Sequence, residues 1–527
     1  MLRLDDVPHR FNVASHFVDR NVAEGRGAHP ALITDAGATS YAELAELVNR
    51  AGNVLRSLGV RRGDRVLLAL HDGVEFVATW YAAQKVGAVT AEVYTYLPVK
   101  DYAYFLDYTA AEVAVVDTVT LGPIRAAAVD RGRRKRLLVV GDAELRPGEH
   151  SFAELTAQAP AELDAPPTTR DDVAIWKFTT GSTGAPKACV HPAHSPLLSF
   201  DWYARGVLDL TADDVVLPVP KLFFGYARDL AALFPFGIGG AAVVFPERST
   251  PERIFELIAR HRPTILVNVP TMMSAMLAHP SAAEQDLSCL RLVTSAGEAL
   301  PAELARRWDE AFGVDVVDGI GSSEAYHIYL SNRPGRPRPG SLGQVVPGYT
   351  AQVVGEDGAP RPDGEVGLLE IRGETVALEY FGAPQLSAAT FVGDRTVRSG
   401  DLFTRDSDGY FYYHGRADDL LKVGGVWVAP SEIEHCIIGH PDVLECAVAG
   451  YEEDGLTRPR AYVVLREGAT VTAPELQQLA RTQLSPHKYP RDVRFVDALP
   501  RTANGKLDRR ALRTLDPPPA AAGGDQT

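Results

Sequence analysis

The chain has 527 residues, of which 46% are hydrophobic and 23% charged, ordinary values for a globular protein. It is too long for a single hydrophobic core, so we expect two or more domains. The formal net charge of −15 argues against nucleic acid or an anionic membrane surface as a partner.

The ends of the chain and its cysteines predict a cytoplasmic protein. We expect no signal peptide, because the first residues form no apolar segment, and no apolar run approaches the ~18 residues that span a bilayer. The four cysteines, at positions 189, 289, 436 and 446, are scattered without CxxC pairing. They fit a reducing compartment and exclude a zinc cluster.

Predicted helices and strands alternate up to about residue 320. A helix over 40–60 begins at a capping-box sequence, with Ser40 followed three positions later by Glu43. This alternation predicts an α/β fold with parallel or mixed sheets flanked by helices. The further strands are predicted at 65–70, 113–116, 137–140, 215–219, 264–269, 290–294 and 314–317, and the further helices at 78–84, 251–260, 271–278 and 301–311.

The sequence changes in character after residue 340. Short strands separated by Gly/Asp/Pro turns predict a small β-rich subdomain over 340–415, inside an N-terminal domain of residues 1–415. A boundary is predicted at 416–419, followed by a compact α+β domain over 420–515. The Pro-, Ala- and Gly-rich tail at 516–527 is predicted to be disordered. The C-terminal helices are predicted at 431–438 and 473–484, and the strands at 443–450, 460–466 and 493–496.

A loop rich in glycine and hydroxyl groups follows the strand-like run at 173–176. Glycines let the backbone bring N–H groups close to an anion, and hydroxyls and an ammonium supply further donors. The spacing differs from the P-loop, and Ala188 rather than a hydroxyl residue follows the lysine. The pattern favours a phosphate cradle over the alternative, a polar surface turn. Its predicted contact residues are Thr179, Thr180, Gly181, Ser182, Thr183, Gly184 and Lys187.

Lysine usage strengthens this interpretation. Only nine of the 53 basic residues are lysines, so a lysine in a glycine-rich loop is unlikely to be there by composition alone. A second such loop, Pro-Arg-Thr-Ala-Asn-Gly-Lys over 500–506, lies near the other end of the chain.

These two loops, with the run Tyr-His-Gly-Arg-Ala-Asp-Asp at 413–419 between them, resemble the adenylate-forming superfamily. This superfamily contains acyl-CoA synthetases, luciferases and peptide-synthetase adenylation domains. The resemblance extends along nearly the whole chain. It implies that a carboxylic acid is activated with ATP and Mg²⁺ and then transferred to a thiol such as that of CoA.

The resemblance assigns roles to several residues of the N-terminal domain. The loop at 179–187 would wrap the β- and γ-phosphates, with Thr183 taking part in catalysis. Glu324 would hold Mg²⁺, although a glutamate after a glycine-rich turn is more commonly a helix N-terminal residue. Asp401 would bind the ribose hydroxyls, and Arg416 follows it at the spacing seen in the family. The further nucleotide contacts implied are Gly297, Glu298, Ala299, Asp318, Gly319, Ile320, Gly321 and Ser323.

The C-terminal domain would supply a mobile cation and the thiol channel. Lys506 follows an Asn-Gly turn that can present it at a loop tip, so we expect it to catalyse adenylation; the alternative is a surface lysine. Asp418 matches the hinge about which this domain swings between the two half-reactions. The residues implied for pantetheine and CoA are Gly424, Gly425, Val426, Trp427, Arg458 and Arg460, although exposed arginines usually bind no ligand.

Four segments, at 11–15, 21–25, 221–226 and 319–328, resemble benzoate–CoA ligases and related aryl-CoA ligases. The resemblance implies a flat acyl pocket with apolar walls and few polar anchors. Its predicted residues are Gly225, Tyr226, Ala296, Gly321, His327 and Ile328.

Two departures from that pattern bear on the acid. Gly225 replaces an alanine, which leaves room for a ring substituent, and Arg228 could pair with a polar one. The alternatives for Arg228 are a place in solvent or an ion pair with Asp229. We therefore expect a benzoate-type acid with a hydroxyl or amino substituent as one option.

Three other functions stay open at this point. An adenylase could load the aryl group onto the phosphopantetheine of a carrier protein, because both acceptors end in the same thiol arm. Luciferase-type oxidation lacks any sequence feature in its favour. A non-catalytic nucleotide-binding protein would have no reason to keep Lys187, Glu324, Asp401, Arg416 and Lys506 together. Both a monomer and a homodimer are compatible with the sequence.

Overall fold

The computed structural model describes residues 1–129, 136–179, 185–423, 426–453, 456–466, 468–485, 487–501, 507–512 and 515. The chain divides into two compact units. The first contains Met1–Ser399 and Phe403–Tyr413, and the second contains Gly400–Leu402 and the chain from His414 onward. The β-rich segment that begins near residue 340 therefore belongs to the first unit. A hinge at 416–419 stays a prediction, and the tail at 516–527 lies outside the described residues.

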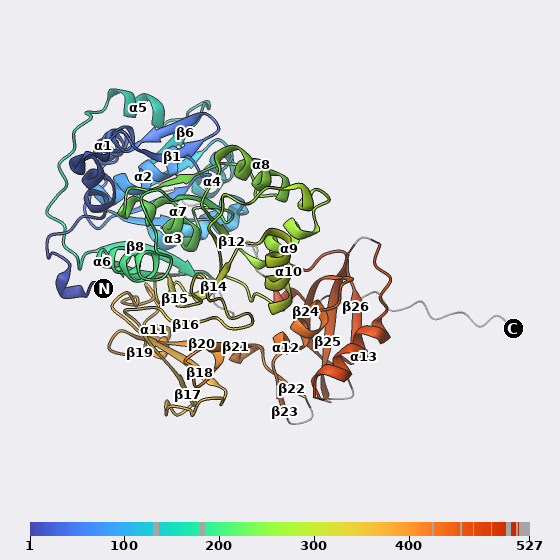
Figure 1. The fold of residues 1–527 in the computed structure, drawn as a ribbon. Coiled ribbons are helices and arrows are strands. Elements are labelled where there is room, and N and C mark those ends of the chain that lie inside the picture. The colour runs from blue at the N-terminus through green and yellow to red at the C-terminus, as the bar shows by residue number, and fades with distance from the viewer. Residues whose placement is uncertain are drawn as a thin grey trace. The chain divides into compact units, whose positions relative to one another are not determined.

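A seven-stranded sheet lies in the first unit (Figure 1). Its strand order is β7-β6-β5-β3-β4-β8-β9, and all neighbours are parallel except the last pair, which forms an antiparallel hairpin. The strands are β3 (Arg65–Ala69), β4 (Val89–Glu92), β5 (Val113–Asp117), β6 (Arg136–Val140), β7 (Glu149–Ser151), β8 (Val173–Thr179) and β9 (Lys187–Pro192).

A nine-stranded sheet follows in the order β16-β15-β14-β13-β12-β10-β11-β1-β2. Its central strands are parallel, and its edges close with antiparallel pairs, including β14 with β15. The strands are β1 (Pro30–Thr34), β2 (Gly37–Ser40), β10 (Val215–Pro218), β11 (Ala241–Val243), β12 (Ile265–Asn268), β13 (Leu292–Ser295), β14 (Val316–Gly321), β15 (Ile328–Ser331) and β16 (Gln344–Val345).

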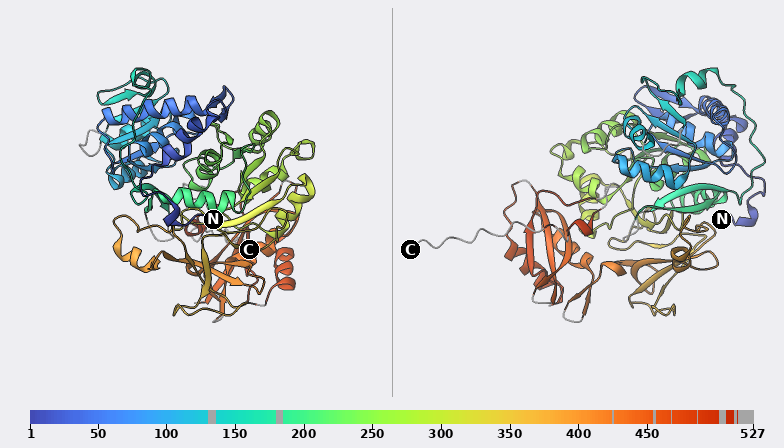
Figure 2. Two further views of the ribbon diagram at one scale, coloured as in Figure 1. Left: turned by 60° about the vertical axis from the view of Figure 1, so that its left-hand side comes forward. Right: turned by 180° about the vertical axis from the view of Figure 1, so that it is seen from behind.

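Helices cover both faces of both sheets (Figure 2). Both faces need cover because the apolar side chains of a strand alternate between them, as in β3. Val66 and Leu68 point into a core shared with the second sheet, whereas Leu67 and Ala69 point to the opposite face. The shared core takes its helical residues mainly from α1 (Tyr41–Ser57), α2 (Val74–Lys85), α5 (Phe152–Gln158), α6 (His194–Ser199) and α7 (Gly225–Ala232). The outer faces are covered by α3 (Val99–Thr109) and α4 (Leu121–Val129) on the seven-stranded sheet, and by α8 (Pro251–His261), α9 (Pro270–Ala278) and α10 (Ala302–Phe312) on the nine-stranded sheet.

The start of α1 confirms the predicted capping box. The Ser40 hydroxyl accepts from the Glu43 N–H at 3.3 Å, and the Glu43 carboxylate accepts from the Ser40 N–H at 2.8 Å. These bonds satisfy N–H groups that have no partner inside the helix. Leu44, Ala51 and Leu55 are buried on one face, as their spacing predicts.

The remaining part of the first unit holds the predicted β-rich segment. Its five-stranded sheet runs β17-β18-β20-β19, with β21 paired to β20. The elements are β17 (Thr350–Val354), β18 (Gly367–Arg372), α11 (Pro384–Thr390), β19 (Phe391–Gly393), β20 (Thr396–Arg405) and β21 (Phe411–Arg416), of which β20 and β21 continue into the second unit.

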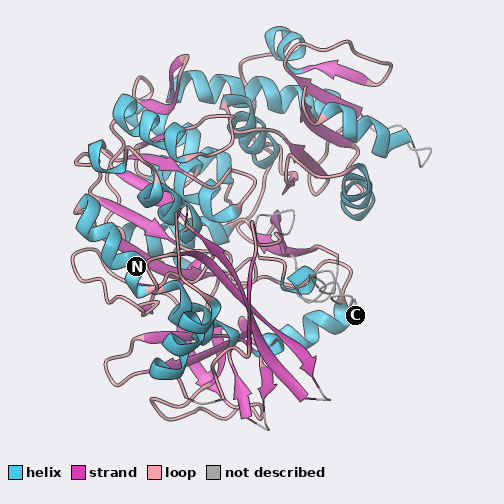
Figure 3. Cartoon of the chain, turned by 90° about the vertical axis from the view of Figure 1, so that its right-hand side faces the viewer, coloured by secondary structure: helices cyan, strands magenta, loops and turns pink. Residues whose placement is uncertain are grey.

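The second unit is α+β, as predicted (Figure 3). A three-stranded sheet, β24-β25-β26, packs against Ile433 and Ile437 of α12 and Leu476 of α13. The described elements are β22 (Leu421–Val423), β23 (Val426–Val428), α12 (Pro430–Ile438), β24 (Val443–Glu453), β25 (Leu456–Leu465), α13 (Ala473–Gln483), β26 (Asp492–Phe495) and α14 (Arg509–Leu512).

In the parts of the chain that the structure describes, no helix is both long and apolar enough to cross a bilayer. All four cysteines are free thiols.

Candidate active site

The predicted phosphate loop closes the β8–β9 hairpin. Thr179 is the last residue of β8, Lys187 is the first of β9, and the two are paired across the hairpin. The intervening residues Thr180, Gly181, Ser182, Thr183 and Gly184 lie outside the described residues. The structure therefore places the two ends of the loop, and the phosphate role remains a prediction.

The glycines at 319 and 321 allow β14 and β15 to approach closely. A Cβ at Gly319 would lie 2.7 Å from the Leu330 carbonyl oxygen, and one at Gly321 would lie 2.4 Å from that of His327. Packing inside the hairpin thus gives these glycines a structural reason. Asp318, before them, is buried, and burial raises the pKa of its carboxyl well above the ordinary value.

Glu324 is held in the loop between β14 and β15 by the β-rich segment. Its Oε1 accepts a hydrogen bond from the Tyr380 hydroxyl at 2.7 Å, and its backbone carbonyl accepts from the Ala377 N–H at 2.8 Å. Tyr380 lies between β18 and α11, and no motif in the sequence marks it as a functional residue. Its hydroxyl fixes the carboxylate that we expect to hold Mg²⁺.

No cluster of three or more His, Cys, Asp or Glu side chains able to hold a metal occurs among the described residues. This arrangement fits Mg²⁺ bound by Glu324, because Mg²⁺ ordinarily takes one or two carboxylates and completes its shell with phosphates and water.

The predicted adenine-side loop follows β13. Gly297 has φ +88°, a left-handed conformation that favours glycine, and Ala296 is buried. Glu298 Oε2 accepts hydrogen bonds from the N–H, at 3.0 Å, and the hydroxyl of Thr271 in the first turn of α9. Glu298 therefore anchors this loop to α9, and adenine contacts by Gly297, Glu298 and Ala299 stay predictions.

Four of the predicted acyl-pocket residues, Tyr226, Gly321, His327 and Ile328, lie together. The rings of Tyr226 and His327 lie 5.9 Å apart, and His327 Nε2 is 3.4 Å from the Tyr226 carbonyl oxygen. The Tyr226 hydroxyl donates to Thr294 Oγ1 at 2.7 Å. Ile328 is buried and pairs with Gly321 across the hairpin. The structure thus brings α7 and the β14–β15 hairpin together at these side chains.

Burial also determines the charge of the pocket wall that Tyr226 and His327 form. It lowers the pKa of His327 to about 3, so the imidazole is neutral at neutral pH. The rings of Phe234 and Tyr203, at 4.9 and 5.4 Å from His327, complete an aromatic surround. A neutral aromatic wall of this kind suits a flat, apolar ligand.

A buried charge cluster, formed by Glu92, Lys177, Arg228 and Asp229, lies behind Gly225. Lys177 Nζ donates to Asp229 Oδ2 at 2.5 Å, and Arg228 pairs with Asp229 Oδ1 at 2.7 Å and Glu92 Oε1 at 2.9 Å. The expectation that Arg228 could lie in solvent is wrong: it is buried, and its ion pair with Asp229 is confirmed. Its guanidinium is paired with two carboxylates, although Nη1, 2.9 Å from Glu92 Oε1, forms no hydrogen bond among the described residues.

Lys177 also holds the loop that carries Glu324. Its ammonium donates to the Tyr326 carbonyl at 2.5 Å and lies 3.6 Å from the centre of the Tyr326 ring. Tyr326 has φ +79°, a strained conformation for a bulky residue. The sequence contained a signal for Lys177, because it is one of only nine lysines and stands inside an otherwise apolar strand.

The second unit brings three predicted residues together. Arg416 lies 3.6 Å from Asp401 Oδ1 and 3.1 Å from Asp418 Oδ1. The proposed ribose ligand and the proposed hinge residue thus share one guanidinium.

The two arginines predicted for CoA lie on β25 and each contact a carboxylate. Arg458 Nε is 2.6 Å from Glu453, and Arg460 Nε donates to Asp492 at 2.7 Å. Lys506, Gly424 and Gly425, and the side chains of Val426 and Trp427, lie outside the described residues.

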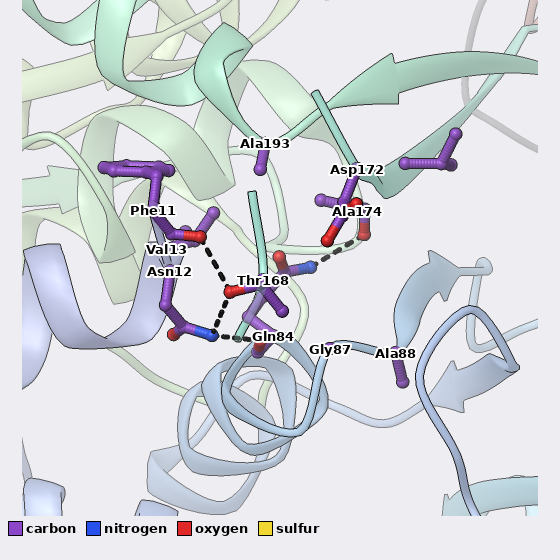
Figure 4. Close-up of a pocket in the computed structure, with 11 residues that line it drawn as sticks. Phe11, Asn12, Val13, Gln84, Gly87, Ala88, Thr168, Asp172, Ala174 and Ala193 are labelled. Carbon is purple, nitrogen blue, oxygen red and sulfur yellow. Dashed lines mark hydrogen bonds between the residues drawn. The ribbon is translucent and has the colours of Figure 1, made fainter. Parts of the chain in front are cut away.

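A small pocket near the N-terminus contains none of the predicted site residues (Figure 4). Its polar groups bind one another: Asn12 donates to the Thr168 hydroxyl at 3.2 Å, which donates to the Phe11 carbonyl at 2.7 Å, and Gln84 donates to the Ala174 carbonyl at 2.8 Å. We interpret it as the place where the N-terminal segment packs, rather than as a ligand site.

Two family models match the chain. The family model described as "AMP-binding enzyme" matches residues 19–381, and that of the AMP-binding enzyme C-terminal domain matches residues 432–506. The chain belongs to the AMP-binding enzyme family. The first match lies within residues 1–415 and the second within residues 420–515.

Several relatives resemble the chain over almost its full length. It is 43% identical to the benzoate–CoA ligase of Thauera aromatica, over 96% of this chain and 97% of the relative. It is 38% identical to the 4-hydroxybenzoate–CoA/benzoate–CoA ligase of Rhodopseudomonas palustris, over 96% and 94%. The crystal structure of the anthranilate CoA ligase AuaEII in complex with anthranoyl-AMP superposes with a TM-score of 0.93 at 35% identity, over 97% and 98% of the two chains.

Proposed function

We propose that this protein is an AMP-forming aryl-acid–CoA ligase that activates a benzoate-type acid. In the first half-reaction, a carboxylate oxygen of the acid attacks the α-phosphorus of ATP and pyrophosphate leaves, which forms aryl-AMP. In the second, the CoA thiol attacks the aryl carbonyl carbon, loses its proton and displaces AMP. The product is an aryl-CoA thioester.

One observation carries the proposal. The β14–β15 hairpin holds both Glu324, the expected Mg²⁺ ligand, and His327, the expected acyl-pocket residue, and His327 lies against Tyr226 of α7. A carboxylate bound at this aromatic wall would lie within a few residues of the group that orients the phosphates. The resemblance to ligases of benzoate and its derivatives supports the same acid class.

The protein's own groups would act mainly by position and charge. The 179–187 loop would hold the β- and γ-phosphates, Asp401 and Arg416 would hold the ribose end, and Lys506 would stabilise charge as it develops at the α-phosphorus. Mg²⁺, held by Glu324, would neutralise phosphate charge. The neutral His327 and Tyr226 would confine the ring without adding a charge to the pocket.

The acceptor and the setting of the enzyme are part of the proposal. Free CoA is the proposed acceptor, with a carrier-protein phosphopantetheine as the alternative. The four free thiols suit the cytoplasm that we propose as its location.

The experiment is an acid panel with a product analysis. Purified protein is incubated with Mg-ATP and benzoate, ring-substituted benzoates or medium-chain fatty acids, with and without CoA. We expect acid-dependent pyrophosphate release with aromatic acids and a thioester of the expected mass only when CoA is present. Aryl-AMP that forms but is never transferred to CoA would favour a carrier protein, and no pyrophosphate release with any acid would favour a non-catalytic nucleotide-binding protein.

A further inference from the structure

Burying the charge cluster of Glu92, Lys177, Arg228 and Asp229 costs free energy. A contribution to stability does not explain why these charges are present. The exposed fractions of its side chains are 5% or less, and its two positive and two negative charges balance. Removing such ions from water costs several kcal/mol each, and well-packed apolar residues often serve stability as well or better. A position behind the proposed acyl pocket therefore points to a role in ligand recognition.

Gly225 makes room for the Lys177 side chain at the proposed acyl pocket. A Cβ at position 225 would lie 3.0 Å from Lys177 Nζ and 3.1 Å from its Cε. Gly225 does not have a positive φ, so its backbone conformation gives no reason for glycine. The absence of a side chain instead lets the Lys177 ammonium lie against Gly225, beside Tyr226 at the start of α7.

The Lys177 ammonium is a hydrogen-bond donor, whereas the Asp229 carboxylate beside it has little acceptor capacity left. An ammonium carries three N–H groups; that of Lys177 donates to Asp229 Oδ2 and to the Tyr326 carbonyl, and it lies 3.6 Å from the centre of the Tyr326 ring. Asp229 Oδ1 already accepts two bonds from Arg228. A ring substituent here should therefore present an acceptor oxygen rather than an amino group.

His327 offers the complementary acceptor. Its buried Nδ1 has no hydrogen-bond partner among the described residues, and its Nε2 faces the Tyr226 carbonyl. With the proton on Nε2, Nδ1 is an acceptor. A hydroxyl group can use both neighbours, since its oxygen accepts from Lys177 while its hydrogen is donated to His327.

We propose that Lys177 is a specificity-determining residue that donates a hydrogen bond to a hydroxyl substituent on the aromatic ring of the acid. The inference rests on the proposed function, which places the ring beside Gly225 and Tyr226. It makes a hydroxybenzoate the preferred substrate class of this ligase.

The test compares the selectivity of four proteins. Wild type, Lys177→Met, Gly225→Ala and the control Lys221→Met are assayed for pyrophosphate release with benzoate, 3- and 4-hydroxybenzoate, and 3- and 4-aminobenzoate. We expect wild type to prefer a hydroxybenzoate, and Lys177→Met to lower the ratio of kcat/KM for that acid over benzoate by about 10-fold or more, because a charged donor is lost. Gly225→Ala retains all four charged residues but puts a Cβ 3.0 Å from the Lys177 ammonium, which must shift, so it should lower the same ratio.

Lys221 is a matched control for the loss of a buried lysine. It lies over the Phe245 ring, and burial lowers its pKa to about 8, as burial does for Lys177. Unlike Lys177, Lys221 does not pack against a glycine: a Cβ added at any described glycine would have no Lys221 atom among its nearest neighbours. Lys221→Met should leave the ratio unchanged even if it lowers stability.

Three results would overturn the inference: no wild-type preference for either hydroxybenzoate, a preference for an aminobenzoate, or an equal loss on all acids in the Lys177 variant. If Lys177→Met does not fold, an unchanged ratio in Gly225→Ala overturns it instead. These failures differ from failure of the proposed function, in which no aromatic acid releases pyrophosphate at all.

Discussion

Two neutral imidazoles flank the loop that carries Glu324. Burial lowers the pKa of both His191 and His327 to about 3. His191 Nε2 donates to the Ser323 carbonyl at 2.7 Å, and His327 Nε2 faces the Tyr226 carbonyl. Protonation would place an uncompensated charge inside the core, so these residues link the stability of the site to pH.

This link predicts a loss of stability in mild acid. Below pH 6.5 the unfolded chain binds protons at both histidines, whereas the folded chain resists protonation until about pH 3. The stabilising contribution is therefore complete above pH 6.5 and is lost as pH falls toward 3, by up to about 1.4 kcal/mol per pH unit for each histidine. Urea unfolding at several pH values between 7.5 and 5 should show a shallower decline for His327→Gln than for wild type. An equal decline would show that His327 is protonated in the folded state.

Many of the site residues could be predicted from residue identity, but the side chains that they contact could not. The resemblance of their motifs to those of a known family marked Glu324, Tyr226 and His327 as candidates. Lys177 and Tyr380 were missed, since each acts through a residue more than 50 positions away and neither belongs to a motif. Long-range pairing of this kind is decided by packing and leaves little trace in local sequence.

At the scale of elements, the β14–β15 hairpin organises the site. It places Asp318 next to Ser295 of β13 and brings Ile328 opposite Gly321. The positive φ of Tyr326 turns the chain back between them, and Lys177 and Tyr380 hold the turn. The alternation of strands and helices predicted this hairpin's first strand, but its strained turn follows from tertiary contacts.

The close approach inside the hairpin predicts a severe effect of one methyl group. Gly321→Ala would put a Cβ 2.4 Å from the His327 carbonyl oxygen, so the backbone must shift. Overpacking of this kind costs about 1–3 kcal/mol, and it would also displace His327. The temperature of thermal unfolding and the rate of benzoate-dependent pyrophosphate release should both decrease. Gly122→Ala, where an added Cβ meets nothing within 4 Å, is the control; equal behaviour of the two variants would contradict the account.

At the scale of the molecule, the chain divides into two compact units. The helices and strands of each unit were largely predictable, because capping, periodicity and turn residues are local signals. The assignment of Gly400–Leu402 to the second unit was not predicted, since it depends on contacts with residues beyond His414. Motion between the units stays a prediction.

A connecting segment between units should be the first site of proteolysis. We expect limited digestion to cut first within 416–430 and to leave a large N-terminal fragment, identified by mass spectrometry. Early cleavage within 200–330 instead would place the weak point inside the sheets and contradict the boundary.

The division of labour between the units predicts that the half-reactions can be separated. Lys506→Ala should lose adenylation by ~10²-fold or more, because a donor to developing charge is removed, and should still convert preformed aryl-AMP and CoA to thioester. A bulky residue at Gly425 should do the reverse, and Asp418→Pro should spare only the half-reaction of its trapped conformer. If Lys506→Ala damages both steps equally, a rotating C-terminal unit is wrong for this chain.

The most direct test of the central claim is ATP–pyrophosphate exchange in the absence of CoA. The account predicts exchange that requires Mg²⁺ and an aromatic acid, is faster with benzoate or a hydroxybenzoate than with hexanoate or octanoate, and is lost in Glu324→Gln. Exchange driven best by a fatty acid, or no exchange with any aromatic acid, would contradict it.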